Sequence, residues 1–129
     1  MSAQPTKLYL WGGRILTALP SLMLIFSAVM KLMGGPDLAT GFDQLGWPIA
    51  LAVPLGILEL AITVIYLIPR TSVIGAILVT GYLGGAVATH LRINEAWIIQ
   101  FLLGVMVWGG LYLRDPRIRE LIPFNKDSR

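Results

Sequence analysis

A single carboxylate, Glu59, lies inside an apolar run from Ile49 to Ile68 that is long enough to cross a membrane. The run contains no basic residue, so the carboxylate has no charged partner nearby in the sequence. A lone carboxylate at the centre of a membrane helix costs about 2.5 kcal/mol or more, so it needs a partner on another helix or a chemical role. That role is the binding of a proton or of a polar ligand group.

Few other polar side chains lie at a similar depth in the apolar runs. Lys31, His90 and Gln100 lie near the ends of three other runs, and Tyr82 precedes His90 by two turns. These residues can converge with Glu59 in one half of the membrane, where Lys31 would pair with Glu59 and His90 would titrate near neutral pH. Because desolvation can cancel the Coulomb gain of a buried ion pair, the set predicts a proton site or a polar ligand site. The alternative is a polar clasp that fixes helix register.

The sequence shows no other catalytic or metal-binding pattern. The chain has no Cys and a single His, which excludes thiolate metal sites, disulfides and a dithiol reaction carried by the chain itself. No metal-ligand spacing, Ser-His-Asp arrangement or phosphate-binding loop stands out. If the protein takes part in redox chemistry, electrons must pass through a cofactor or a partner protein.

The composition indicates a membrane protein. Hydrophobic residues make up 56% of the 129 residues and charged residues 13%, whereas a soluble domain carries about 25% charged residues. The basic residues lie at the ends of apolar runs, which is typical of topology signals and lipid contacts. No basic run alternates with aromatic residues, so the net charge of +3 gives no reason to expect nucleic acid as a partner. The length fits a single membrane domain over residues 1–129.

Four apolar segments predict an all-α fold, a bundle of four transmembrane helices. Each segment has about 18 to 21 residues, enough at about 1.5 Å per residue to cross a hydrocarbon core of about 30 Å. The first is expected to stay as a signal-anchor helix, since it continues past its small residues to Lys31. The segments span residues 15–33, 48–68, 72–90 and 96–113.

The positions of the Lys and Arg residues predict the orientation of this bundle. Lys31 and Arg92 fall on one face, and the other eight Lys and Arg residues fall on the face that holds both termini. Because short cytoplasmic segments carry the excess of Lys and Arg, we expect both termini in the cytoplasm. The predicted location is the inner membrane of a bacterial cell, with several passes.

Two further expectations concern packing. The helix over residues 72–90 carries small residues that let helix backbones approach closely, so we expect it in the middle of the bundle. These residues are Gly75, Gly81, Gly84, Gly85, Ala86 and Ala88, and Gly81 and Gly85 form a pair four residues apart. The segment Gly34–Trp47 is the longest connection and carries Gly, Pro and Asp residues. It is expected to form either a solvated loop or a short lid over the outer end of the bundle.

Several stretches of the sequence closely resemble the DoxX-like family of small four-helix membrane proteins. The resemblance covers about residues 14–114, and its longest motif is the third-helix sequence TGYLGGAVATHLR. The matching stretches are Ser27–Leu32, Gly56–Leu60, Ile68–Leu78 and Thr80–Arg92.

The resemblance implies an accessory role in quinone-linked redox or oxidative-stress metabolism. The family is named after a subunit linked to a terminal quinol oxidase, and a similar subunit belongs to a thiosulfate:quinone oxidoreductase. It therefore implies a quinone as the candidate cofactor and a membrane or redox protein as the candidate partner. The alternatives are a non-catalytic scaffold or assembly factor and, third, a small proton-coupled transporter. Catalytic activity and homo-oligomerisation remain open, and the absence of Cys argues against a thiol oxidoreductase.

Overall fold

The computed structural model describes residues 7–121, and every regular element in that range is helical. Two short 3₁₀ turns, η1 and η2, lead into the second and third long helices. The helices are α1 (Lys7–Met33), α2 (Pro36–Leu45), α3 (Ala52–Leu67), α4 (Ser72–Arg92), α5 (Ile98–Arg114) and α6 (Pro116–Leu121), and the turns are η1 (Ile49–Leu51) and η2 (Pro69–Thr71).

The long helices have the length and composition of membrane spans. Within the described residues, α1, α3 with η1, and α4 with η2 are long and apolar enough to cross a bilayer. The fourth, α5, is equally apolar but has 17 residues, a rise of about 25 Å. The prediction of an all-helical fold with membrane-spanning helices is confirmed.

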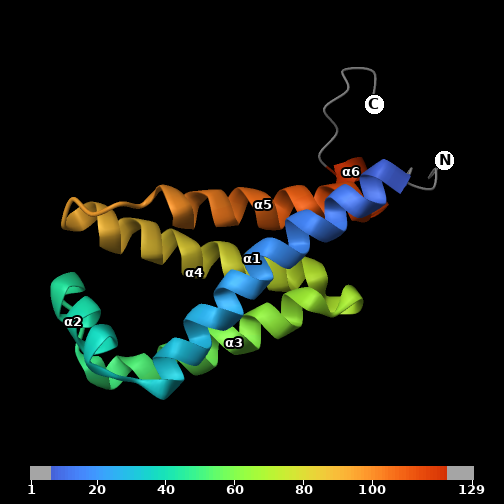
Figure 1. Cartoon of the computed structure of the whole chain (residues 1–129). Helices are drawn as coiled ribbons and strands as arrows, with labels where there is room; N and C mark the ends of the chain where they lie inside the picture. The colour runs from blue at the N-terminus through green and yellow to red at the C-terminus, as the bar shows by residue number, and fades with distance from the viewer. Residues whose placement is uncertain (1–6, 122–129) are drawn as a thin grey trace.

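The four long helices form a ring. Figure 1 shows α4 and α5 side by side, with α1 crossing them and then running along α3. Helix α1 packs on both α3 and α5, and α4 completes the ring between those two helices. The first described turn of α1 and helix α6 lie at the same end of the bundle (Figure 1), where the Arg119 guanidinium lies 6.0 Å from the ring centroid of Tyr9.

Helix α1 contacts its two neighbours closely because they carry glycine at the crossing points. A Cβ atom on Gly110 of α5 would lie 2.6 Å from the Oγ1 atom of Thr17, and a Cβ on Gly56 of α3 would lie 3.0 Å from the carbonyl oxygen of Ala28. In a bilayer, where lipid tails are as apolar as Leu, such close packing holds helices together. Glycine at these two positions therefore determines how α1 sits in the ring.

The prediction that the helix over residues 72–90 lies in the middle of the bundle is wrong. A Cβ atom on Gly81 or Gly85 would meet no atom within 4 Å, so this glycine face of α4 is uncovered by the described residues. The close approach of α4 is made instead at Gly75, where a Cβ would lie 2.3 Å from the backbone of Tyr66 on α3. Gly81 and Gly85 instead line a cavity between α2, α3 and α4.

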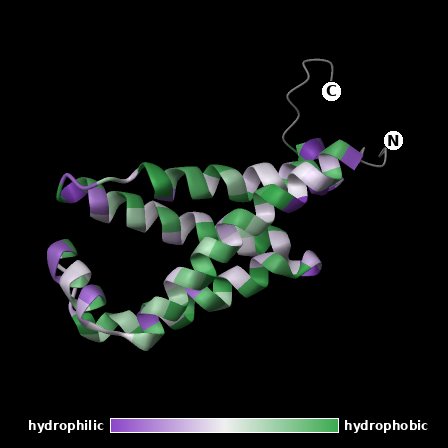
Figure 2. Cartoon of the chain, viewed as in Figure 1, coloured by the Kyte–Doolittle hydropathy of each residue, from purple (hydrophilic) through white to green (hydrophobic). Residues whose placement is uncertain are grey.

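The outer surface of the ring is apolar. Large hydrophobic side chains are about half exposed or more on every long helix, among them Phe26, Ile57, Ile74 and Val105. Figure 2 shows hydrophobic residues along the long helices and hydrophilic ones gathered mainly at the two ends and on α2. A water-soluble monomer rarely exposes so large an apolar surface, whereas in a bilayer it contacts lipid. The fold is that of a membrane protein.

The connection between the first two spans is a helix. Helix α2 begins after Gly34 and Gly35 and ends at Gly46, and all three glycines have positive φ angles of 75°, 121° and 78°. Such angles favour glycine because it lacks a Cβ. The side chain of Phe42 is only 6% exposed, so α2 is anchored to the bundle. The segment is therefore a helix and not an irregular loop, and its residues other than Phe42 are exposed or half-buried.

Candidate functional site

A cavity of about 640 Å³ opens at the end of the bundle where α2 lies. It is bounded by α1, α2, α4 and α5, with one residue from α3. All five polar residues selected from the sequence line it: Lys31, Glu59, Tyr82, His90 and Gln100. The structure thus brings together side chains from four long helices.

The centre of the site is an ion pair. The Nζ atom of Lys31 lies 3.0 Å from Oε1 of Glu59, and their side chains are 16% and 3% exposed. Lys31 also donates a hydrogen bond of 2.6 Å to the Ser27 hydroxyl, which donates in turn to Glu59 Oε1 at 3.2 Å. The charge of the buried carboxylate is therefore balanced by a lysine and a hydroxyl from one helix, and the lysine remains partly accessible.

Ser27 belongs to this site although it was not selected from the sequence. It lies four residues before Lys31, a spacing that places both side chains on the same face of α1. This spacing was the one feature of the sequence from which Ser27 could have been selected. Serine in a membrane helix more often bonds to the carbonyl four residues earlier, as Thr63 does here with the Glu59 carbonyl at 2.7 Å.

His90 and Gln100 form a second polar pair in the cavity wall. The Nδ1 atom of His90 lies 2.7 Å from the Ala86 carbonyl oxygen, which assigns the proton to Nδ1. Nε2 then accepts from the Gln100 amide, whose Nε2 lies 3.5 Å away. The Oε1 atom of Gln100 is buried and has no hydrogen-bond partner among the described residues. A donor on a ligand can satisfy this carbonyl oxygen only when the side chains that cover it move aside.

Tyr82 connects the cavity to a smaller one beside it. Its hydroxyl is close enough to the Glu59 carboxylate for the two to interact electrostatically. The second cavity, of about 350 Å³, lies between α2, α3 and α4 and shares Lys31, Phe42, Tyr82 and His90 with the first. The site therefore has two compartments that share a wall of polar side chains.

Helix α2 covers both compartments. Phe42 and Leu45 of α2 line each of them, and Asp37 brings a second carboxylate to the larger cavity. The Arg92 guanidinium, at the end of α4, donates a hydrogen bond to the Leu45 carbonyl. This contact ties the end of α2 to α4. Helix α2 thus lines the opening of the polar site at the end of the bundle away from α6.

A separate polar cluster lies nearer the termini. The Tyr66 hydroxyl donates to the Val107 carbonyl at 2.7 Å, and Arg114 donates from Nε to Thr17 Oγ1 at 2.9 Å. The Arg114 guanidinium carbon is 5.4 Å from the Tyr66 ring centroid. Within residues 7–121, the hydrogen bonds of this cluster do not extend to the Glu59 carboxylate, which bonds to Ser27 and Lys31. The cluster connects α1, α3 and α5, and its Arg114 Nη2 atom is buried without a hydrogen-bond partner among the described residues.

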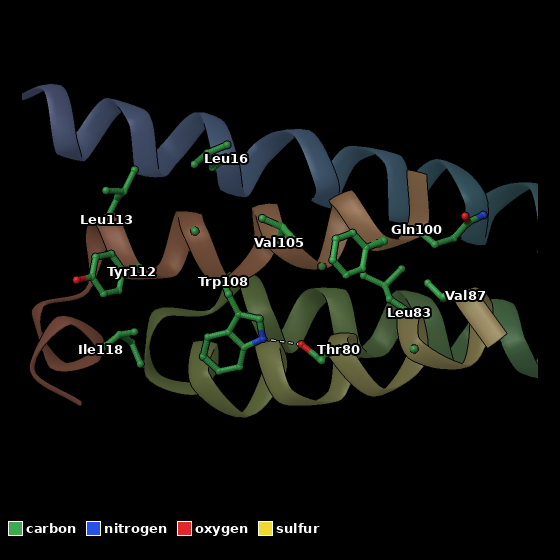
Figure 3. A pocket seen from close by; sticks show the side chains of 14 residues that line it. Leu16, Thr80, Leu83, Val87, Gln100, Val105, Trp108, Tyr112, Leu113 and Ile118 are labelled. Atoms are coloured by element: carbon green, nitrogen blue, oxygen red, sulfur yellow. Dashed lines mark hydrogen bonds between the residues drawn. The ribbon is translucent and has the colours of Figure 1, made fainter. Parts of the chain in front are cut away.

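An apolar groove of about 720 Å³ runs along the outside of α4 and α5. In Figure 3, Gln100, Leu83 and Val87 lie at one end, and Tyr112 and Ile118 at the other. Trp108 and Thr80 point toward each other across the groove, with 2.6 Å between Nε1 and Oγ1 (Figure 3). Leu83 and Gln100 line both this groove and the polar cavity. Nothing in the sequence pattern had indicated the groove.

The polar site suits an organic ligand with oxygen atoms. Lys31, Tyr82 and the Gln100 amide can donate hydrogen bonds, whereas the Glu59 carboxylate and Gln100 Oε1 can accept them. Among residues 7–121 no group of three or more His, Cys, Asp or Glu side chains could hold a metal ion. The donors and acceptors can pair with carbonyl and hydroxyl groups of such a ligand.

Comparisons with known proteins give the family of the chain. Searches of curated proteins and of solved structures find no significant match. The family model of the DoxX-like family matches residues 15–110, about three quarters of the chain, and this range includes all five candidate residues. The resemblance seen in the sequence is confirmed, and the chain belongs to the DoxX-like family.

Proposed function

We propose that this protein is a ligand-binding accessory subunit of the inner membrane that serves quinone-linked redox or oxidative-stress metabolism. The observation that carries the proposal is the buried Lys31–Glu59 ion pair, 3.0 Å between Nζ and Oε1, in the wall of a 640 Å³ cavity. An ion pair placed only for stability is better surrounded by packed side chains, since desolvation cancels much of its Coulomb gain. Here a cavity adjoins it, and cavities of this size hold small organic ligands.

The chain's own residues would hold the headgroup of a quinone or quinol. Lys31 and Tyr82 donate to a carbonyl oxygen, and Glu59 and Gln100 Oε1 accept from a hydroxyl. Glu59 is placed to take up or release the proton of such a hydroxyl, with Lys31 balancing its charge. A bound quinone would supply the two-electron redox chemistry that this cysteine-free chain lacks.

The test compares two substitutions that remove one carboxylate each. Glu59→Gln keeps the shape of the side chain and removes the acceptor charge in the cavity. Glu95→Gln changes an exposed carboxylate in the turn between α4 and α5. Native mass spectrometry of the gently extracted protein identifies retained molecules, and titration with a decyl benzoquinol measures affinity.

We expect Glu59→Gln to lose any retained small molecule and to weaken quinol binding about tenfold or more, because the neutral amide oxygen is a much weaker acceptor than the carboxylate and cannot take up a proton. Glu95→Gln should bind like the unaltered protein. Equal binding by both variants, or no binding by the unaltered protein, contradicts the proposal.

A scaffold or assembly role is the second candidate, favoured by the uncovered glycine face of α4. Gly81 and Gly85 line the smaller cavity beside α2 and contact no other residue there, so a helix of another chain that enters this cavity can pack closely on them. In that case Gly81→Leu with Gly85→Leu would abolish the co-purification of a defined membrane partner, and Glu59→Gln would leave its yield unchanged. The opposite pattern supports the ligand-binding role.

A further inference from the structure

We infer that the ligand of the polar cavity is an amphiphile whose hydrocarbon chain lies in the lateral groove between α4 and α5. The inference rests on the proposed function and extends it, since it names the chemical class of the ligand and the route by which it enters. It is carried by the geometry of the groove, by the residues that the groove and the cavity share, and by one unpartnered acceptor at their junction.

The groove has the shape and lining of a hydrocarbon-chain site. Its 14 lining residues are mostly apolar, and its volume of about 720 Å³ exceeds that of the polar cavity. Along α5 it extends from Gln100 to Tyr112 (Figure 3), a rise of about 18 Å. The two polar groups in its middle, Thr80 and Trp108, are joined to each other by a 2.6 Å hydrogen bond. Because these two groups bond to each other, the middle of the groove wall presents no charge to the ligand's hydrocarbon chain.

Gln100 lies at the junction of the groove and the polar cavity. Together with Leu83 it lines both. Its Nε2 faces His90, while its Oε1 is buried and has no partner among the described residues. A buried acceptor without a donor costs about 1–3 kcal/mol, so the position favours a ligand that donates a hydrogen bond. A hydroxyl at this point would have its ring or headgroup in the cavity and its chain leaving along the groove.

Glycines keep the junction open. A Cβ atom on Gly84 of α4 would meet no atom within 4 Å, and one on Gly104 of α5 would meet only Leu83, at 3.9 Å. Larger side chains are therefore tolerated at both positions and would project into the groove that these glycines line. Such side chains would block the ligand's hydrocarbon chain and leave the contacts between the helices unchanged.

The groove provides a lateral route from the bilayer. The lipid around the protein is as apolar as the groove, so the chain gains little free energy by moving from one to the other. The advantage is steric, because the headgroup reaches Glu59 while the chain never leaves a hydrocarbon environment. A headgroup without a chain does not need the groove and can enter from the aqueous end beside α2.

The experiment titrates three proteins with a pair of probes. The probes are a dimethoxy-methyl benzoquinol that carries a decyl chain and the same benzoquinol without the chain. The proteins are the unaltered chain, the double variant Gly84→Leu/Gly104→Leu, and the control Ala61→Leu. Ala61 is an exposed residue of α3 that lines none of the three cavities. Monodecanoylglycerol serves as a competitor with an ordinary lipid chain and hydroxyl groups.

We expect the double variant to bind the decyl probe about tenfold or more weakly than the control does, because overpacking a filled site costs about 1–3 kcal/mol. The chain-free probe should bind all three proteins equally. Equal binding of the decyl probe by the double variant overturns the inference and leaves the proposed function intact. Displacement of the decyl probe by monodecanoylglycerol at equal concentration supports the groove as a chain site but contradicts the proposed function, since the cavity then takes an ordinary lipid as readily as a quinol. If neither probe binds the unaltered chain, both the inference and the proposed function fail.

Discussion

At the scale of single residues, the Lys31–Glu59 pair can be separated into its structural and functional parts. Lys31→Met should lower the free energy of unfolding by about 3 kcal/mol, because it leaves the carboxylate buried without its cation. The double variant Lys31→Met/Glu59→Gln removes both charges and should recover most of that loss. Denaturation in mixed micelles measures stability, and quinol titration measures binding.

The two readouts distinguish a binding site from a polar clasp. If the Lys31–Glu59 pair belongs to a binding site, the double variant should be stable but should not bind the quinol probe. A double variant as unstable as Lys31→Met would contradict the charge argument. Restored stability together with full binding would show that the pair serves only helix register.

The residues of this site were largely predictable, and the reason is the cost of burying them. Lys31, Glu59 and His90 stand out because charged or titratable side chains are rare in apolar runs. Ser27 does not stand out, since serine is common in membrane helices and its bond to Glu59 depends on the crossing of α1 and α3. The unpartnered oxygen of Gln100 is likewise visible only once its neighbours are placed.

At the scale of elements, two glycines that look alike in the sequence have opposite roles. Gly110→Ala should lower the free energy of unfolding by about 1–3 kcal/mol, because its Cβ would lie 2.6 Å from Thr17 Oγ1. Gly81→Ala is the matched control, since its Cβ meets no atom within 4 Å. It should be neutral, or stabilising by up to about 1 kcal/mol through helix propensity. Equal effects of the two substitutions on unfolding in micelles would disprove this packing of α1 against α5.

The positions of the helices could be predicted from the lengths of the apolar runs, whereas the packing partners of each helix could not. Apolar runs of membrane-spanning length gave the four spans to within a few residues, apart from the early start of α1 at Lys7. The glycine spacing in α4 gives no information about which helix covers it, because any small-residue face allows close approach. Helix α2 was not identified as a helix because its ten residues include Gly41 and end at Gly46. Its role as a cover depends on Phe42 inserting into the bundle.

At the scale of the whole molecule, the polar groups are divided between two levels of the bundle. Lys31, Glu59, His90 and Gln100 gather at the end covered by α2, and Arg114 lies with Tyr66 toward the termini. Leu24 of α1, which is 2% exposed, lies in sequence between the α1 residues of the two groups. Two buried hydroxyl residues, Ser21 of α1 and Thr63 of α3, also lie in sequence between the two groups. Thr63 bonds to the Glu59 backbone carbonyl, and Ser21 Oγ has no hydrogen-bond partner among the described residues. No continuous hydrogen-bonded path therefore joins the two levels within residues 7–121, which favours ligand binding over the proton-coupled transporter.

The orientation of the chain then decides from which side the site receives its ligand. The described end that holds the termini carries most of the Lys and Arg residues, and the end with α2 carries Lys31 and Arg92. Because positive charge is retained in the cytoplasm, we expect α2 and the polar cavity on the outer side. The chain has no Cys, so single cysteines can report this directly. A membrane-impermeant maleimide should label Asp43→Cys on α2 in intact spheroplasts, and should label Glu120→Cys on α6 only after permeabilisation. Val105→Cys, on the lipid-facing side of α5, should stay unlabelled in both conditions. The reverse pattern for the first two variants would place the site on the cytoplasmic side, where soluble reductants and proteins could reach it.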